Sequence, residues 1–289
     1  MATTYNNLYL SIRTMLRGEG SAEATQAARE LVCAASGKTR EELMRDRMLY
    51  ASDEVERTAY ALSQRHLAGE PVAYLIGEWE FYGLPLDISR SVLIPRPDTE
   101  VLAEQVIAAA RARPECRVLD LCAGSGCVGL AVASQVEGAR VLLGELDEEA
   151  LKVCRQNIRR CGLTARVAAA RLNALEKPPR QLEAYDILAC NPPYIPTADI
   201  EALDASVRDY EPRLALDGGA DGLDFYRAIT EKWRPVLADG GLLAFEVGIG
   251  QANDVARLMR AGGFGDLQIV QDSAGIARVV YGRKYRAVL

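Results

Sequence analysis

Histidine is almost missing from this 289-residue chain, which contains only His66. A single histidine argues against a histidine-dependent catalytic triad and against a histidine-rich metal site. None of the seven cysteines forms a Cys-x-x-Cys pair, the spacing of many zinc and thioredoxin-like sites, and their number is odd. We therefore expect free, mostly buried thiols and no metal.

Long apolar runs are also missing, since no stretch approaches the roughly 18 uninterrupted apolar residues of a membrane helix. The first 20 residues lack the basic, apolar and small-residue segments of an export signal, so we expect a soluble, cytoplasmic protein without membrane contact. Basic residues are not in excess, because 34 Lys and Arg stand against 40 Asp and Glu, a net charge of -6. This balance argues against tight duplex binding, which needs cationic contacts to several phosphates.

The composition is that of a folded protein, and the length allows about two domains. Residues 1–70 carry apolar side chains at helical spacing with glycines as breaks, which predicts a small N-terminal helical bundle. Residues 71–95 are rich in aromatic and β-branched residues, with Gly77 and Gly83 as turn signals. They are expected to form a β-hairpin that links the bundle to a domain of residues 96–289.

Strand and helix patterns alternate in that last domain. A helix is expected over residues 99–111, and strands over residues 117–121, 139–146, 165–172, 185–191 and 241–247. Strands separated by helices predict an α/β fold with a mostly parallel sheet covered on both faces. The last two strands, residues 266–271 and 277–284, have too short a connection for a crossover helix and must pair antiparallel.

A glycine loop follows the first of these strands, at residues 120–126 (DLCAGSG). Gly124, Gly126 and Gly129 match the Gly-x-Gly-x-x-Gly pattern of nucleotide-binding loops, in which the next helix offers free N–H groups to an anionic group. Glu145 ends the second strand, about 20 residues on, where a carboxylate can accept hydrogen bonds from both ribose hydroxyls. The pattern predicts a nucleotide-like ligand.

Asp120 distinguishes between possible ligands. Its carboxylate would repel a pyrophosphate, and this, with the antiparallel strand pair, disfavours a dinucleotide dehydrogenase. S-adenosylmethionine carries no phosphate, and Asp120 could face its positively charged amino-acid end while the ligand's carboxylate takes the helix N-terminus. Structural alternatives also stay open: Asp120 as a strand-end cap, and Glu145 as a solvated side chain beside a purely structural glycine turn.

The fourth strand ends in Asn191-Pro192-Pro193-Tyr194. Two prolines fix the backbone and remove two N–H donors at the sheet edge where open α/β sheets bind ligands. The side-chain oxygen of Asn191 and the carbonyl of Pro192 could each accept one hydrogen from a planar NH₂ group, with the ring of Tyr194 against its flat face. The alternative is a structural turn, because Asn-Pro commonly begins turns.

These motifs resemble the Class I S-adenosylmethionine-dependent methyltransferases, and among them the release factor glutamine methyltransferases (the PrmC/HemK group). The resemblance covers nearly the whole chain and includes residues 70–77 (EPVAYLIG), 92–100 (VLIPRPDTE), 211–218 (EPRLALDG) and 221–224 (DGLD). Asn-Pro-Pro-Tyr alone is shared with adenine and other amino-group methyltransferases, whereas residues 94–100 are more specific. The resemblance implies a helical N-terminal domain, a hairpin and a Rossmann-like, seven-stranded catalytic domain. It also implies methylation of the glutamine amide in the Gly-Gly-Gln motif of peptide chain release factors.

The resemblance also implies a set of site residues. The expected cofactor is S-adenosyl-L-methionine, which leaves as S-adenosyl-L-homocysteine. Its expected contacts are Asp120, Cys122, Ala123, Gly124, Ser125 and Gly126 in the loop, Glu145 at the ribose, and Asn173 with Ala174 near the adenine. Asn191, Pro192, Pro193 and Tyr194 are expected to bind the glutamine, and Asn191, Pro192 and Tyr194 to be catalytic. Two positions depart from the family pattern, since Asn173 and Glu145 each stand where Asp is commoner.

Several questions stay open at the level of the sequence. A nucleic-acid adenine methyltransferase, a glutamine methyltransferase of a ribosomal protein and a non-catalytic protein of the same fold are alternatives to the release factor enzyme. We expect a monomer that binds the release factor directly and does not bind nucleic acid. Residues 1–70 are expected to recognise the release factor, with a stabilising cap as the alternative role.

Overall fold

The protein is described by a computed structural model of residues 3–113, 115–182 and 184–285. The ends of the predicted first and last domains, residues 1–2 and 286–289, lie outside the described residues. The chain divides into two compact units. Of the described residues, those up to Glu78 and Ala205–Tyr210 form a helical unit, and those within Trp79–Asp204 and from Glu211 to Tyr285 form a sheet unit.

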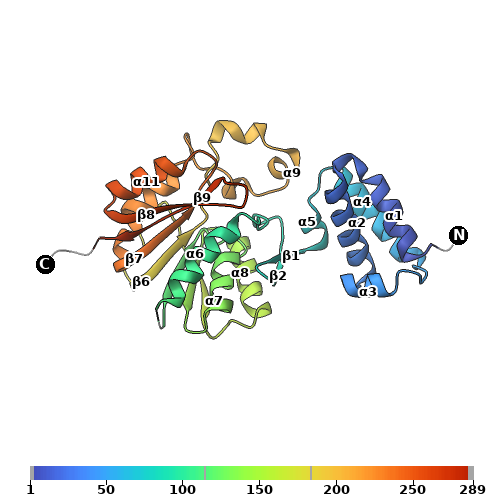
Figure 1. Ribbon diagram of the computed structural model, residues 1–289, viewed down its shortest axis with the longest axis horizontal. Coiled ribbons are helices and arrows are strands. Elements are labelled where there is room, and N and C mark those ends of the chain that lie inside the picture. The colour runs from blue at the N-terminus through green and yellow to red at the C-terminus, as the bar shows by residue number, and fades with distance from the viewer. Residues whose placement is uncertain (1–2, 114, 183, 286–289) are drawn as a thin grey trace. The chain divides into compact units, whose positions relative to one another are not determined.

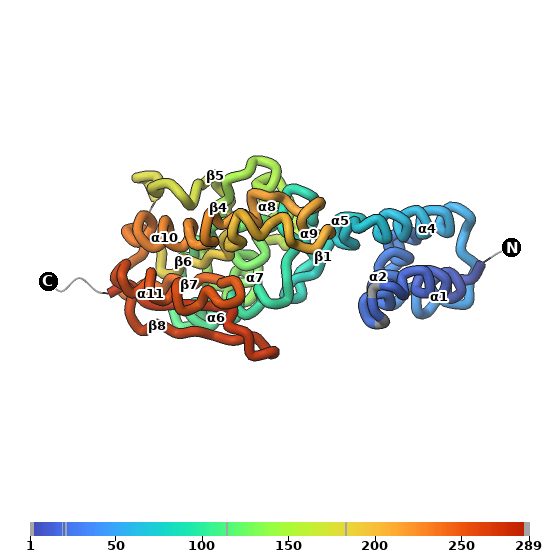
Figure 2. The backbone as a smooth tube through the Cα atoms, turned by 90° about the horizontal axis from the view of Figure 1, so that it is seen from above, coloured from blue at the N-terminus to red at the C-terminus, as the bar shows by residue number. Residues whose placement is uncertain are grey.

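The helical unit confirms the predicted bundle. Helices α1, α2 and α4 pack against one another around a core that includes Leu8, Ile12, Leu31 and Val32 (Figure 2). Side-chain caps begin several helices, as Ser52 does for α4. The elements are α1 (Tyr5–Met15), η1 (Arg17–Glu19), α2 (Ser21–Ser36), α3 (Arg40–Arg45), α4 (Asp53–Leu67), α5 (Val72–Ile76) and α9 (Ala205–Arg208).

The hairpin is shorter than predicted. Its strands are β1 (Glu78–Phe81) and β2 (Leu84–Asp87), whereas residues 72–76 of the expected hairpin form helix α5. Pro71 precedes the helix, and Gly77 ends it with a φ of 75°, a left-handed conformation that favours glycine. Val72, Leu75 and Ile76 pack on the bundle core, so tertiary packing outweighs the strand preference of these residues.

The sheet unit contains seven strands in the order β5-β4-β3-β6-β7-β9-β8. The first five in this order are parallel, and β9 is antiparallel to both β7 and β8. This confirms the predicted mostly parallel sheet with an antiparallel C-terminal pair. The strands are β3 (Arg117–Leu121), β4 (Arg140–Glu145), β5 (Val167–Arg171), β6 (Tyr185–Cys190), β7 (Leu237–Glu246), β8 (Phe264–Gln271) and β9 (Ala277–Lys284).

Helices cover both faces of this sheet. Figure 1 shows α6 (Thr99–Arg111), α7 (Cys127–Gln135) and α8 (Glu148–Arg160) on one face and α11 (Ala252–Ala261) on the other, where α10 (Asp224–Ala228) lies beside it (Figure 2). The core under α10 and α11 contains Tyr226, Trp233, Phe245 and Phe264. Short turns of helix complete the unit: η2 (Thr197–Ala202), η3 (Arg213–Ala215), η4 (Ile229–Trp233) and η5 (Arg234–Val236).

The strand order positions the site. The chain runs from β3 to β4 on one side and later enters β6 on the other, so β3 and β6 flank a topological switch point. Open α/β sheets bind ligands in the crevice at the carboxyl ends of such strands. The glycine loop follows β3 and Asn191 follows β6, which brings both motifs to this crevice.

The cysteines are less buried than expected. All seven cysteines are free; Cys116, Cys154 and Cys190 are buried and the other four are partly buried. None of the described helices combines the length and apolar character that crossing a membrane requires.

Candidate active site

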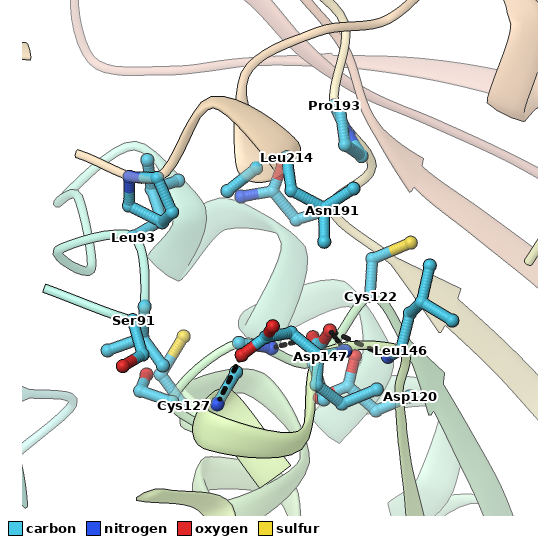
Figure 3. Close-up of a pocket in the computed structure, with 18 of the residues that line it drawn as sticks. Ser91, Leu93, Asp120, Cys122, Cys127, Leu146, Asp147, Asn191, Pro193 and Leu214 are labelled. Carbon is cyan, nitrogen blue, oxygen red and sulfur yellow. Dashed lines mark hydrogen bonds between the residues drawn. The ribbon is translucent and has the colours of Figure 1, made fainter. Parts of the chain in front are cut away.

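A pocket of about 290 Å³ lies at the carboxyl edge of β3, β4 and β6 (Figure 3). It brings together most of the predicted site residues, because its lining includes Asp120, Cys122, Ala123, Gly124, Ser125, Glu145, Asn173, Ala174, Asn191 and Pro193. Three predicted residues are outside this lining. Gly126 caps the start of α7, Pro192 is buried and Tyr194 is partly buried.

Backbone conformation and close packing explain why glycines occupy positions 124, 126 and 129. Gly124 and Gly126 have positive φ angles of 56° and 83°, which cost other residues free energy. A Cβ on Gly126 would lie 2.7 Å from Leu143 Cδ1, and one on Gly129 would lie 2.4 Å from Leu143 Cδ2. A Cβ on Gly124 would meet no atom within 4 Å. Gly126 and Gly129 thus allow α7 to pack closely on β4, while Gly124 serves the turn.

Glu145 is held by the backbone around it. Oε2 accepts a hydrogen bond from the N–H of Gly124 at 2.9 Å. Oε1 accepts from the N–H groups of Leu146 at 2.7 Å and Asp147 at 3.0 Å. These bonds fix the carboxylate at the end of β4, in the wall of the pocket.

Asp120 is buried beneath the loop, with 2% of its surface exposed. Its Oδ2 accepts a hydrogen bond from the Gly129 N–H at 2.9 Å, in the first turn of α7. Burial, which disfavours the charged form, raises the pKa of Asp120 to about 7, and Glu145 adds to the rise by repulsion. One oxygen therefore binds the first turn of α7, and the residue also lines the pocket. The choice between a strand-end cap and a cofactor contact stays open.

Asn173 and Ala174 line the pocket but are engaged locally. The Asn173 Oδ1 accepts from the Leu175 N–H at 3.0 Å, and its Nδ2 donates to Glu176 Oε1 at 3.0 Å. The Ala174 carbonyl accepts from the buried Trp233 indole at 3.0 Å. The adenine contacts of these two residues stay a prediction.

Asn191 is oriented by two residues that the sequence did not single out as site residues. Its Nδ2 donates to Thr99 Oγ1 at 3.3 Å, and its side chain also interacts with the Glu246 carboxylate and lowers the pKa of that group. Because the NH₂ end is engaged, the oxygen is the available end of the amide. Thr99 belongs to the motif at residues 92–100. A lone acid in the apolar run at residues 241–247 (GLLAFEV) is the signal that could have revealed Glu246.

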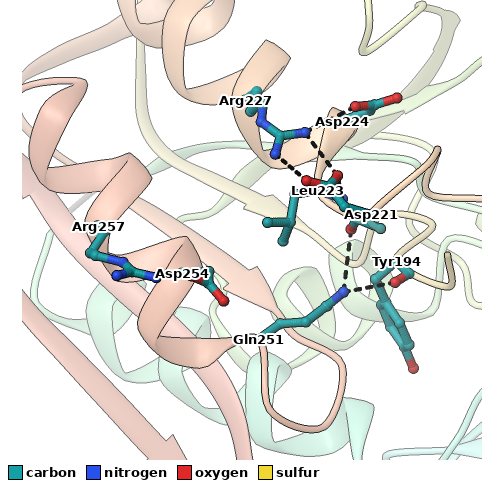
Figure 4. A network of polar contacts seen from close by, with 9 residues as sticks. Tyr194, Asp221, Leu223, Asp224, Arg227, Gln251, Asp254 and Arg257 are labelled. Carbon is teal, nitrogen blue, oxygen red and sulfur yellow. Dashed lines mark hydrogen bonds and ion pairs between the residues drawn. The ribbon is translucent and has the colours of Figure 1, made fainter.

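The backbone after Asn191 is held by the loop at residues 218–224 (Figure 4). Gln251 Nε2 donates to the carbonyl of Tyr194 at 2.9 Å and to that of Gly222 at 3.4 Å. A Cβ on Gly218 would lie 2.9 Å from the Pro193 carbonyl oxygen, and one on Gly222 would lie 2.3 Å from that of Tyr194. The motifs at residues 211–218 and 221–224 therefore support the Asn-Pro-Pro-Tyr turn.

An ion pair between the buried Glu211 and the partly exposed Arg96 joins two further motifs at the pocket. Glu211 accepts from the Arg96 guanidinium and from the Ile94 N–H, the latter at 3.3 Å. Burial raises the pKa of Glu211 above its ordinary value, against the attraction of Arg96. Arg96 is the one cationic side chain among the described lining residues, which include the acids Asp120, Glu145, Asp147 and Glu149. The pocket thus offers no cluster of cations to a pyrophosphate.

Comparisons with known proteins agree along the chain. Residues 8–77 match the family described as PrmC N-terminal domain, and residues 89–211 match the family described as Conserved hypothetical protein 95. The release factor glutamine methyltransferase of Geobacter sulfurreducens is 45% identical over 222 residues, which cover 77% of this chain and 76% of that protein. The protein of the same name from Caulobacter vibrioides is 36% identical over 284 residues, 98% of each chain.

Among solved structures, a methyltransferase from Pyrococcus furiosus is similar with a TM-score of 0.51 and 16% identity, covering 77% of this chain and 97% of that one. At this identity the similarity supports the fold alone. The sequence identities extend over both the helical unit and the sheet unit with its pocket, and on that basis the chain belongs to the release factor glutamine methyltransferase family.

Proposed function

We propose that this protein transfers a methyl group from S-adenosyl-L-methionine to the side-chain amide nitrogen of the glutamine in the Gly-Gly-Gln motif of peptide chain release factors. One observation carries the proposal. Asn191, with its amide oxygen available as an acceptor, lines the same pocket as the glycine loop and Glu145. An acceptor for an NH₂ group thus lies beside a nucleoside site.

The residues of the pocket fit this cofactor. Glu145 lies where a ribose would be held, and Gly124 presents an open backbone surface beside it. The acids Asp120 and Asp147 suit a ligand with a positive sulfonium and ammonium group better than one with a pyrophosphate. When bound, the cofactor supplies an electrophilic methyl group; no metal is required.

The chemistry of the turn follows from the substrate. An amide nitrogen is a poor nucleophile, because its lone pair is delocalised into the carbonyl. Asn191 Oδ1 and the Pro192 carbonyl would each accept one N–H of the glutamine, and both stabilise positive charge that develops on the nitrogen. The ring of Tyr194 would lie against the amide, and Pro193 in the pocket wall would help to exclude water. The product loses its proton readily, so no general base is needed.

The helical unit supplies specificity in this proposal. A pocket that binds an amide flanked by glycines contacts few side chains of the substrate and can recognise little of its sequence. A second contact surface would therefore help to hold the release factor. Met44, Met48, Leu49 and Tyr50 expose 58% to 70% of their surface and are suitable contacts. The protein would act as a monomer in the cytoplasm, without binding nucleic acid directly.

The test is a labelling experiment with three substrates. The purified protein is incubated with methyl-labelled S-adenosyl-L-methionine and, separately, with a bacterial release factor, ribosomal protein and DNA. We expect label only on the release factor, at the glutamine of its Gly-Gly-Gln motif, and none when that glutamine is replaced by alanine. Label on DNA or on ribosomal protein alone would contradict the proposal.

A further inference from the structure

Glu246 is a buried acid whose surroundings only partly satisfy it. It ends β7 with 3% of its surface exposed, and its carboxylate interacts with Thr99 and Asn191. Its other oxygen, Oε2, is buried and has no hydrogen-bond partner in the described part of the chain. A buried carboxylate with an unused acceptor is destabilising. A reason for it therefore lies in function rather than in stability.

The sheet places Glu246 beside Asn191. Cys190 and Phe245 are paired in the parallel strands β6 and β7, so the next residues of each strand, Asn191 and Glu246, are neighbours at the sheet edge. Thr99 is the first residue of α6, only 1% exposed, and lies within hydrogen-bond distance of Asn191. The backbone of Glu246 is held in turn, because its carbonyl accepts from the Tyr226 hydroxyl at 2.9 Å.

The donor and acceptor properties of Thr99 and Glu246 determine which end of the Asn191 amide faces them. An ionised carboxylate only accepts hydrogen bonds. The Thr99 hydroxyl accepts from Asn191 and can therefore direct its own proton to Glu246. With the Thr99 proton directed to Glu246, a rotated Asn191 amide would place its oxygen against the lone pairs of the Thr99 hydroxyl and against the Glu246 carboxylate, and its NH₂ group would face the pocket. Thr99 and Glu246 thus select one of the two amide orientations.

If the protein methylates glutamine as proposed above, we infer that Thr99 and Glu246 are positioning residues that hold the Asn191 oxygen toward the substrate NH₂ group. The negative charge of Glu246 also polarises the hydrogen-bonded chain and strengthens Asn191 as an acceptor. This matters most when positive charge develops on the substrate nitrogen, so turnover depends on the pair more than substrate binding does.

The contact of Glu246 with Thr99 and Asn191 also makes turnover sensitive to pH. Burial raises the pKa of Glu246 to about 7, and a protonated Glu246 becomes a donor that competes with the Asn191 NH₂ group. Turnover should fall as the pH drops through this range. Two charged groups act on Glu246: Asp98 raises its pKa and Arg278 lowers it. The charge of Glu246 in turn raises the pKa of three neighbouring groups, Tyr194, Tyr226 and Cys127.

The experiment compares four variants: Thr99→Val, Thr99→Ser, Glu246→Gln and Thr230→Val. Thr230 is the matched control, because it is 3% exposed, has no partner for its hydroxyl in the described residues and lies in η4, away from the pocket lining. For each variant kcat and KM are measured on intact release factor, and the cofactor Kd by calorimetry. The pH profile of kcat is recorded on both sides of pH 7.

We expect Thr99→Val and Glu246→Gln to lower kcat by about tenfold or more, with KM and the cofactor Kd within about threefold of wild type. Thr99→Ser should recover most of the turnover lost in Thr99→Val, and Thr230→Val should match wild type. Glu246→Gln should also lose the acidic limb of the pH profile. Wild-type kcat in both Thr99→Val and Glu246→Gln, with an active wild type, would overturn this inference alone. A wild type that methylates no release factor would overturn the proposed function and, with it, the inference.

Discussion

The backbone N–H of Gly124 donates to Oε2 of Glu145 at 2.9 Å, so the carboxylate that ends β4 also fastens the glycine loop after β3. Two more N–H groups, from Leu146 and Asp147, bind its Oε1. A carboxylate has about four acceptor sites, and three are taken. Glu145 can accept hydrogen bonds from both ribose hydroxyls only if one of its three hydrogen bonds to backbone N–H groups breaks. If Glu145 binds the ribose as proposed, cofactor binding and loop conformation should be coupled at this residue.

The first prediction concerns this coupling. Glu145→Ala should weaken S-adenosyl-L-methionine binding by about 1.5 to 3 kcal/mol, the range for hydrogen bonds to a charged group. Calorimetry measures the change, and Glu137→Ala is the control, because Glu137 is exposed and outside the pocket lining. If Glu145→Ala binds the cofactor as tightly as Glu137→Ala, Glu145 is not the ribose ligand.

Asn191→Ala tests the amide-binding turn. The lost hydrogen bond is made mainly to the reacting amide, so kcat should fall by orders of magnitude while cofactor affinity stays within roughly tenfold. Turnover with labelled cofactor and calorimetry on the same preparation separate the two effects. A variant that keeps nearly wild-type turnover would refute the role of Asn191 as acceptor.

Contiguous motifs made much of the site predictable. The glycine loop, Glu145 and Asn191 each sit at the end of a strand, and parallel strands bring their carboxyl ends to one edge, so three local patterns suffice to place them together. The antiparallel strand pair followed in the same way from the short connection before Ala277. Helix α5 was missed, because its packing on the bundle decides its conformation.

The supporting contacts were not predictable from local pattern. Thr99, Asn191 and Glu246 lie far apart in the chain, and only the strand register and the docking of α6 bring them together. From the sequence, Gly218 and Gly222 are interpreted only as turn residues. The structure shows that the close approach of the Tyr194 backbone requires glycine at both positions. The resemblance at residues 211–224 indicated that this segment matters without giving the physical reason.

Gly222→Ala tests that close approach. Gly222 has a φ of 74°, and its added Cβ would lie 2.3 Å from the Tyr194 carbonyl oxygen. Gly162 has a similar φ of 68° with no atom within 4 Å of an added Cβ, so Gly162→Ala carries the backbone strain alone. Gly222→Ala should lose about 1 to 3 kcal/mol more stability than Gly162→Ala, and turnover as well. Equal losses in urea unfolding and equal kcat would show that the turn tolerates the displacement.

Asp120→Asn should change how stability depends on pH. The pKa of Asp120 is about 7 in the folded protein against an ordinary value of 3.8, so the folded state binds more protons between these values. Stability therefore falls as the pH rises through this window, and the cost, on the order of 4 kcal/mol at most, is fully present above pH 7. Asparagine carries no charge and can still accept from the Gly129 N–H.

Urea unfolding at about pH 5 and about pH 8 measures this effect. Asp120→Asn should be more stable than wild type at the higher pH, with a smaller difference at the lower pH. The exposed Asp199 provides the control, since Asp199→Asn changes the same side chain outside the pocket. A difference between Asp120→Asn and wild type that is the same at both pH values would show that Asp120 does not titrate in this range.

The last prediction separates recognition by the helical unit from a purely stabilising role. Met48 and Tyr50 expose 70% and 68% of their surface, so replacing both with serine removes apolar contact area without opening a cavity in the bundle. If this surface binds the release factor, kcat/KM should fall about tenfold or more on the intact release factor, because contacts remote from the chemistry help to hold the substrate. On a short Gly-Gly-Gln peptide, which reaches only the pocket, the double variant should match wild type.

Leu67→Ser, at a residue that is 44% exposed elsewhere on the same unit, is the control and should leave both values of kcat/KM unchanged. Equal losses on intact protein and peptide would favour the cap, whereas unchanged values on both would exclude Met48 and Tyr50 from the contact.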